Sequence, residues 1–196
     1  MADLPQDSPP PDAALDLEQH QVRRAQLGDS AAFRWLFDRY APSVRRFATD
    51  ILRNADAADE CTQETFVRAH RQLAGLRETD KWKSWLFSTA HFVALEQRRK
   101  SQRVVSTDHD TPERADRALD PESALLGREA DDLIDRALAT LSEDRRAALL
   151  LRIDHGLGYE PIAQIMGWSL SKAKVEVHRA RLSLREQVGA YVEGAS

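Results

Sequence analysis

The chain contains 196 residues, of which 42% are hydrophobic and 31% are charged, and its formal net charge is −4. It has no apolar run long enough to span a bilayer and no basic-then-apolar N-terminal signal, so we expect a cytoplasmic protein without membrane insertion. The single cysteine, Cys61, excludes an internal disulfide, and the histidines show no metal-ligand spacing with it. We therefore expect no metal site and no other cofactor.

The negative net charge does not exclude nucleic-acid binding, because the charges are unevenly distributed. Residues 1–20 contain five carboxylates and no Lys or Arg, so the rest of the chain carries a formal charge of +1. Basic residues are concentrated near 98–103 and 172–185. Phosphate binding depends on such local patches rather than on the overall isoelectric point.

The N-terminal part of the chain predicts two helices in succession. A short helix is expected over residues 15–27 and is stopped by Gly28, while Asp29 or Ser30 can cap the next helix. The apolar residues of this next helix keep helical spacing well beyond its middle. Pro42 falls inside that pattern and predicts a kink or a break.

Two further helical patterns of opposite character follow. The first begins near Asp56 and places a polar row on one face, formed by Asp56, Asp59, Glu60 and Gln63. The second begins near Trp82, where the spacing of Trp82, Trp85 and Leu86 favours a core position for both tryptophans, and it ends in a basic cluster. One interpretation is a pair of docking surfaces, one for a basic protein and one for nucleic acid. The alternative, which charge pattern alone favours, is two solvated faces of a helical bundle.

The whole chain is expected to be all-α, with two small helical domains and no strand-like alternation. Residues 104–122 lose periodicity, contain two prolines and hold six acidic residues against two basic ones, which is typical of a flexible linker. The Pro- and Asp-rich start of the chain favours disorder. The predicted boundaries are a disordered tail at 1–14, a first domain at 15–103, the linker at 104–122 and a second domain at 123–190.

The second domain has the layout of a helix-turn-helix. A helix is expected over 124–139, and Ser142 is expected to cap another. A short helix over 160–166 is followed by a tight turn, in which Ser169 can cap a longer helix. The apolar positions of that longer helix share one face: Ala173, Val177, Ala180 and Leu184. Such a basic amphipathic second helix is the element that enters a DNA major groove in this motif.

Three segments of the chain resemble the bacterial RNA polymerase sigma factors of the extracytoplasmic-function type. DAADECTQETF resembles the D-x-x-D-x-x-Q-E-x-F segment of that family, and KWKSWLFSTAHFVALEQRRK resembles its aromatic W-L-x-x-A-x-N-x-x-x-D helix. LSEDRRAALLLRIDHGLGYEPIAQIMGWSLSKAKVEVHRARLSLRE is similar to its closing domain. The resemblance covers residues 28–100 and 130–188. It implies a transcription initiation factor with a region 2-like bundle and a region 4-like helix-turn-helix domain.

The resemblance also implies a set of partners and contact residues. The first domain would dock on the β′ clamp helices of core RNA polymerase through Asp56, Asp59, Gln63, Glu64 and Phe66. It would capture the melted −10 strand of promoter DNA with the loop before Trp82 and the following helix, through Lys81, Ser84, Ser88, His91, Arg98, Arg99, Lys100 and Arg103. The second domain would hold the polymerase β flap and the −35 element, with DNA contacts from Ser169, Ser171, Lys172, Lys174, Val175, Glu176 and Arg179. An anti-sigma factor is the expected regulator.

The candidate recognition helix departs from the family pattern. Where the family usually has T-V-K-S-R, this chain has Lys-Ala-Lys-Val-Glu at 172–176, so Glu176 replaces a habitual arginine. Glu176 could accept from a cytosine amino group, could repel phosphate and weaken promoter binding, or could form a local salt bridge with Arg179 or Lys172. We favour the salt bridge. His91-Phe92 and Glu96 depart from the pattern of the −10 helix as well, so the −10 sequence preference of the family does not transfer.

Two rival hypotheses belong to other functional classes. The first is a helix-turn-helix regulator that binds a palindromic operator as a dimer, without polymerase. The second is a sigma mimic, which binds an anti-sigma factor and starts no transcription. An enzyme is the least favoured hypothesis, because the sequence has no glycine-rich phosphate loop, nucleophile elbow or metal-ligand cluster.

Overall fold

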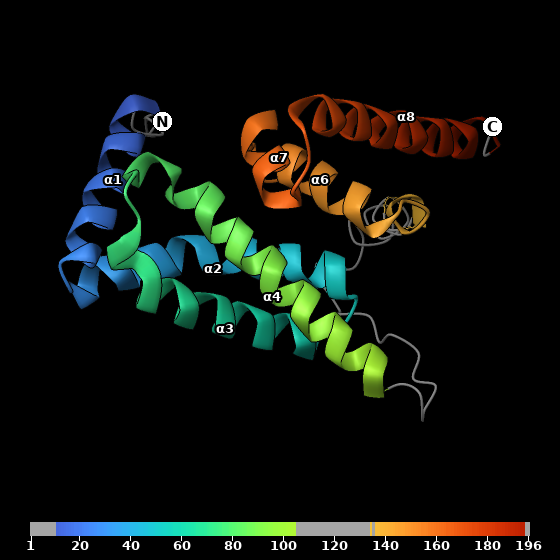
Figure 1. Cartoon of the computed structure of the whole chain (residues 1–196). Helices are drawn as coiled ribbons and strands as arrows, with labels where there is room; N and C mark the ends of the chain where they lie inside the picture. The colour runs from blue at the N-terminus through green and yellow to red at the C-terminus, as the bar shows by residue number, and fades with distance from the viewer. Residues whose placement is uncertain (1–10, 105–133, 135, 195–196) are drawn as a thin grey trace, which may run out of the picture.

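The computed structural model describes residues 11–104, 134 and 136–194, and these ranges contain helices and turns but no strand (Figure 1). The N-terminal bundle is formed by α1 (Pro11–Gln26), α2 (Ser30–Leu52), α3 (Ala55–Gln72) and α4 (Trp82–Val104). Two 3-10 turns, Leu73–Gly75 and Thr79–Lys81, connect α3 to α4. The C-terminal domain holds α6 (Glu143–Ile153), α7 (Tyr159–Met166) and α8 (Leu170–Gly194). The expected all-α fold with two small helical domains is confirmed.

The first helix begins earlier than the sequence pattern predicted. α1 starts at Pro11, before the helix predicted from residue 15 and inside the segment expected to be a disordered tail. Proline is tolerated in the first helical turn, because its missing N–H has no intrahelical partner there and its fixed φ suits a helix. The rest of the predicted tail, the predicted linker from residue 105 onward and most of the helix predicted over 124–139 lie outside the described residues.

α2 is capped as predicted but continues through its proline. The Asp29 carboxylate accepts hydrogen bonds from the backbone N–H groups of Ala31 (2.9 Å) and Ala32 (3.1 Å). The bond from Ala32 and the nearby Arg24 side chain lower the pKa of Asp29. The helix runs unbroken from Ser30 to Leu52 with Pro42 inside it, so a break at Pro42 is wrong. Pro42 lies on the exposed side of α2, while the buried face on both sides of it packs against the bundle. That packing offsets the loss of one backbone hydrogen bond.

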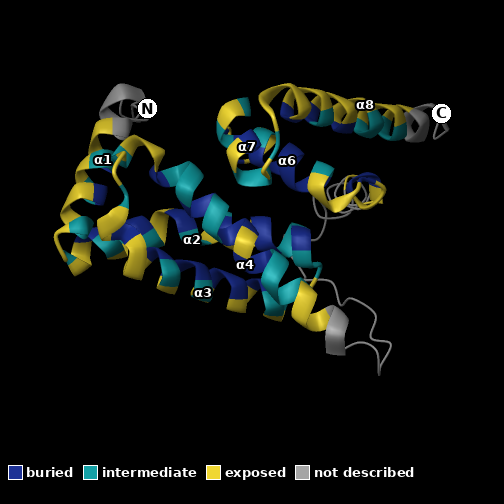
Figure 2. Cartoon of the chain, viewed as in Figure 1, coloured by how far each residue is buried: buried dark blue, intermediate teal, exposed yellow. Residues whose placement is uncertain are grey.

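The core of the N-terminal bundle is aromatic and aliphatic. Trp82 is fully buried, with its ring 6.3 Å from that of Tyr40, and Phe47 meets Phe87 edge to face at 5.5 Å. The core position predicted for Trp82 is confirmed, and Trp85 packs against the same cluster while partly exposed. Figure 2 shows the buried faces of α2, α3 and α4 turned toward one another, with exposed residues on the outer surfaces.

The helix-turn-helix geometry follows from local signals. Gly167 takes a left-handed conformation (φ +64°) that closes α7, a conformation that glycine adopts without steric cost. The Ser169 hydroxyl accepts a hydrogen bond from the Lys172 backbone N–H (3.2 Å), so the predicted cap is confirmed. Ala173, Val177 and Ala180 are fully buried, as their spacing predicted. Ser142 occupies the N-cap position of α6, but its side chain makes no capping hydrogen bond.

The two domains lie against each other. α6 packs on α2, and α7 packs on α4 (Figure 1). None of the helices in the described part of the chain is both long enough and apolar enough to cross a membrane.

Candidate functional site

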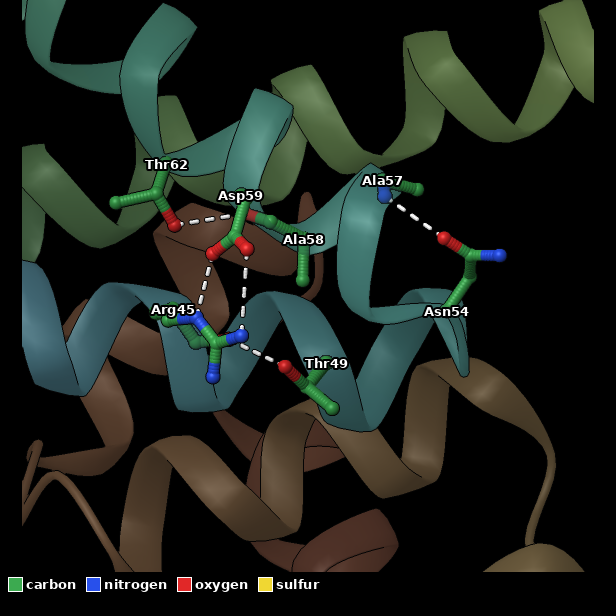
Figure 3. Close-up of polar contacts among 7 residues, drawn as sticks. All are labelled: Arg45, Thr49, Asn54, Ala57, Ala58, Asp59 and Thr62. Atoms are coloured by element: carbon green, nitrogen blue, oxygen red, sulfur yellow. Dashed lines mark hydrogen bonds and ion pairs between the residues drawn. The ribbon is translucent and has the colours of Figure 1, made fainter. Parts of the chain in front are cut away.

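The predicted acidic row forms an exposed ridge on α3. Asp56, Asp59, Glu60 and Gln63 are all exposed. Opposite them Ala58, Cys61, Thr65 and Ala69 are fully buried, and burial raises the pKa of the Cys61 thiol to about 11. The Asn54 side chain accepts a hydrogen bond from the Ala57 backbone N–H (2.8 Å) and starts this helix (Figure 3).

Two carboxylates of the α3 surface already have cationic partners within the chain. Arg45 on α2 donates to both oxygens of Asp59, with Nε–Oδ1 at 2.5 Å and Nη2–Oδ2 at 3.3 Å (Figure 3). This pair holds the pKa of Asp59 below its usual range. Arg68 donates to Glu64 (2.6 Å) and also pairs with Glu96 on α4 (2.8 Å). Helical periodicity in the sequence does not predict these pairings.

An apolar groove lies between α2 and α3 beside the ridge. Its volume is about 490 Å³, and it is lined by Phe33, Phe37, Gln63, Phe66, Val67, His70 and Arg71. Phe66 is only 4% exposed and packs edge to face on Phe37 with ring centroids 4.8 Å apart. Phe66 therefore belongs to the groove floor rather than to its rim. A second groove of about 460 Å³ separates α3 from α4 and carries charged residues, among them Glu60, Glu64, Glu96 and Lys100.

The predicted −10 residues are spread over several sides of α4 and the turn before it. Lys81 is exposed and paired with Glu78 (2.5 Å), whereas Ser84 and Ser88 are half-buried. Arg99 and Lys100 are exposed near the end of α4. Arg103 lies in its last turn, with its side chain outside the described part of the structure. The structure does not bring these residues onto one surface.

Two of the predicted −10 residues face the C-terminal domain instead of solvent. His91 is 7% exposed, and burial lowers its pKa despite the nearby Asp144. Arg98 forms an ion pair with Glu143 at the start of α6. By contrast Phe92, which the sequence analysis did not select, is 54% exposed, and the Arg68 guanidinium lies 5.7 Å from its ring centroid. An exposed aromatic beside basic residues on this helix was the signal that could have identified it.

The recognition helix presents its predicted DNA contacts outward. Ser169, Ser171, Lys172, Lys174, Val175 and Arg179 are all exposed. Lys172 lies over the Trp168 ring, 4.7 Å from its centroid. The N-terminal part of α8 therefore forms one continuous outward surface of hydroxyl, cationic and apolar side chains.

Glu176 is held in a salt bridge, the interpretation favoured from the sequence, although its main partner was not foreseen. Arg145 on α6 donates to the Glu176 carboxylate across the helix pair, and Arg179 approaches it at 3.4 Å. The side chain of Glu176 is 14% exposed, and Arg145 holds its pKa below the usual range. Glu176 thus joins α8 to α6.

The contact between the domains is centred on His155, in the turn after α6. Its ring lies 4.2 Å from that of Phe87 on α4 and 5.7 Å from that of Phe47 on α2. Burial, together with the smaller effects of Lys83 and Arg46, lowers the pKa of His155 to about 4. Arg46 also pairs with Asp154 (3.0 Å), and Arg146 donates to the Asp50 carbonyl (3.5 Å).

Comparison with known proteins identifies the family to which this chain belongs. The family described as Sigma-70 region 2 matches residues 36–104, and the family described as Sigma-70, region 4 matches residues 131–184. RNA polymerase sigma-H factor of Pseudomonas aeruginosa is 32% identical over 174 residues, which cover 84% of this chain and 90% of that protein. This chain belongs to the sigma-70 family of RNA polymerase sigma factors. Within the family it is of the extracytoplasmic-function type, as the next comparisons indicate.

This sigma factor is also similar to the ECF RNA polymerase sigma-E factor of Escherichia coli K12. The two are 30% identical over 180 residues, which cover 87% of this chain and 94% of that protein. Among solved structures it is similar to the sigma factor RpoE in complex with the anti-sigma factor NepR from Bartonella quintana. That match has a TM-score of 0.69 and 27% identity, and covers 80% of this chain and 96% of the other. The region 2 match spans most of α2 together with α3 and α4, and the region 4 match spans α6, α7 and the recognition-helix part of α8.

Proposed function

We propose that this sigma factor binds core RNA polymerase through α3 and its two flanking grooves, and directs initiation at promoters through α4 and α8. The observation that carries the proposal is the match of both sigma regions in order. Of the predicted polymerase-binding residues, Asp56, Asp59 and Gln63 lie on the exposed ridge, while Phe66 forms the floor of the groove beside it. A transcription initiation factor of this kind acts through its partners, and its specificity lies in surfaces rather than in a catalytic centre.

The polymerase-binding proposal rests on the chemistry of the α3 surface. Exposed carboxylates suit a basic partner, and the apolar groove beside them offers Phe37 and Val67 to apolar side chains of the same partner. A ridge between two grooves fits an amphipathic helical element, which is the form expected of the polymerase clamp helices. Asp56 and Glu60 are exposed on this ridge, and the structure gives them no intrachain salt bridge among the described residues.

The promoter-binding proposal assigns different tasks to the two domains. Arg99 and Lys100 are placed to contact phosphates, which position a strand without specifying its sequence. Phe92 adds an exposed ring on the same helix, and an unpaired base can stack on such a ring. The outward surface of α8 is assigned to the duplex −35 element. Control by an anti-sigma factor is part of the proposal, supported by the similar sigma factor solved with one.

A reconstitution experiment tests the proposed function. Purified sigma factor is added to core RNA polymerase with fragmented genomic DNA, and the transcripts that start are sequenced. Specific start sites that depend on the sigma factor support the proposal. Polymerase binding without specific starts would instead identify a sigma mimic. Operator binding by a dimer without polymerase would identify a plain helix-turn-helix regulator.

A further inference from the structure

The outward pole of the recognition helix carries two exposed apolar side chains. Successive residues of an α-helix are rotated by about 100°, so the fully buried Ala173, Val177 and Ala180 define the inward direction of α8. Val175 falls on the opposite side of the helix and is 44% exposed. Leu182, two turns further on, shares this direction and is 40% exposed.

Cationic side chains flank this pole on both sides. The same rotation places Lys174, Arg181 and Arg185 along one flank and Lys172 and Arg179 along the other, and all five are exposed. A DNA major groove is about 12 Å wide and is bounded by a phosphate strand on each side. Two cationic flanks with the apolar Val175 between them match those two strands and the base edges between them.

The ion pair of Glu176 fixes the direction in which the pole points. Glu176 is the neighbour of Val175 in sequence, and Arg145 on α6 holds its carboxylate against the domain. The pair therefore anchors the rotation of α8 about its own axis and withdraws a negative charge from the DNA-facing surface. Its side chain is only 14% exposed, so the carboxylate does not compete with Val175 for a base edge.

We propose that Val175 reads the C5-methyl group of a thymine in the −35 element. This inference rests on the proposed function, because it requires α8 to enter the major groove. Thymine is the one base that presents a methyl group there. A valine side chain cannot donate or accept a hydrogen bond. A guanine or cytosine opposite Val175 would therefore have its major-groove hydrogen-bonding groups left without a partner. The cationic flanks favour DNA over a protein surface as the occupant of this pole.

Removing single methyl groups from DNA tests the proposal. The probe is a double-stranded promoter fragment found in the reconstitution experiment, in which each thymine of the −35 region is replaced in turn by deoxyuridine. The affinity of each fragment for polymerase that carries the sigma factor is measured by competition with the unmodified fragment. Burial of one methyl or methylene group is worth about 0.8 kcal/mol, so we expect about a fourfold loss at one position. With Val175→Ala, thymine and deoxyuridine should bind equally at that position.

A matched variant separates this contact from general DNA affinity. Lys174→Ala removes a neighbouring cation, and it should weaken every fragment while keeping the methyl dependence. Specific binding without a deoxyuridine effect at any thymine, or a methyl effect that survives in Val175→Ala, overturns the proposal while leaving the proposed function intact. If the Val175→Ala variant fails to assemble with core polymerase in the absence of DNA, the pole contacts protein and the proposal is overturned as well. Failure of the loaded polymerase to bind any fragment specifically rejects the proposed function itself.

Discussion

At the scale of single residues, the carboxylates of the two proposed binding surfaces differ in what they can still contact. Asp59 and Glu64 are half-exposed and each shares its charge with an arginine, so a partner meets an ion pair rather than an isolated anion. Glu176 is withdrawn almost completely into its pair with Arg145. The first two remain available for binding, whereas the third serves the architecture of its own domain.

Neutralising Asp59 and Glu64 together should weaken assembly with core polymerase. Both carboxylates are partly exposed, where a charge contributes little, so Asp59→Asn with Glu64→Gln should lower the affinity for core polymerase by about 5–30-fold. Fluorescence titration of core polymerase measures this effect, which should shrink at high salt. Asp38→Asn is the matched control, because Asp38 also pairs with an arginine, Arg34, at 3.0 Å but lies on α2. Unchanged assembly in the double variant would contradict the role of the α3 ridge.

Breaking the Glu176–Arg145 pair should destabilise the C-terminal domain. Glu176→Gln should lower the free energy of unfolding by about 1 kcal/mol, and the exchange Glu176→Arg with Arg145→Glu should restore part of it. Because the pair lowers the pKa of Glu176, its contribution is present above the pKa of the unfolded chain and is lost as the pH falls through the folded pKa. Urea unfolding of both variants at neutral and acidic pH measures this, and equal stability of wild type and Glu176→Gln at neutral pH would contradict it.

At the scale of elements, local signals identified the helices, while contacts between helices could not be predicted. The cap by Asp29, the turn at Gly167 and the inward face of α8 depend on neighbouring residues only, and all three follow from the sequence. Arg45 and Asp59 are 14 positions apart, and Arg145 and Glu176 are 31 apart. Such pairs depend on how two helices cross, which periodicity does not specify. The exposure of the α3 ridge and of the outward residues of α8 was therefore predictable, but the burial of Phe66 and His91 and the ion pairs between helices were not.

Pro42 allows the helix-destabilising effect of proline to be measured against the packing that keeps α2 unbroken. Proline in a helix interior is about 3 kcal/mol less favourable than alanine, and Pro42 lies on the exposed side of an unbroken helix. Pro42→Ala should raise the free energy of unfolding by about 1–3 kcal/mol, because the backbone regains a donor and loses no buried contact. Urea denaturation checks this, with the exposed Ala31→Ser change in the first turn of α2 as a small-effect comparison. A decrease in stability would mean that the proline shapes the packing of the neighbouring core residues.

At the scale of the whole molecule, the domains are joined through His155 and the ion pairs around it. His155 is neutral between Phe87 and Phe47, with Arg46 and Lys83 as the nearest cations and Asp154 bound to Arg46. Its Nε2 atom is buried and finds no hydrogen-bond partner among the described residues. This arrangement favours the uncharged ring and therefore links closure of the two domains to pH.

Acid should loosen the contact between the domains. The pKa of His155 is lowered from 6.5 to about 4, so a solvated His155 binds more protons than a packed one between these two values. Closure should weaken as the pH falls through this window and should be independent of this group above it. Small-angle scattering across the window should show earlier expansion for wild type than for His155→Phe, which keeps a ring but cannot titrate. Identical expansion profiles for the two proteins would contradict the link.

The covered face of α4 has a consequence for how tightly promoters can be held. The family resemblance assigns His91 and Arg98 to the −10 strand, yet both are engaged with the C-terminal domain when the two domains are in contact. These side chains cannot make both sets of contacts at once. The apparent promoter affinity of the free chain is therefore reduced in proportion to the fraction of molecules whose domains are separated. Core polymerase, by holding the two domains apart, would expose these side chains to promoter DNA. The sigma factor without polymerase would bind DNA weakly and would not be sequestered by non-specific sites across the genome.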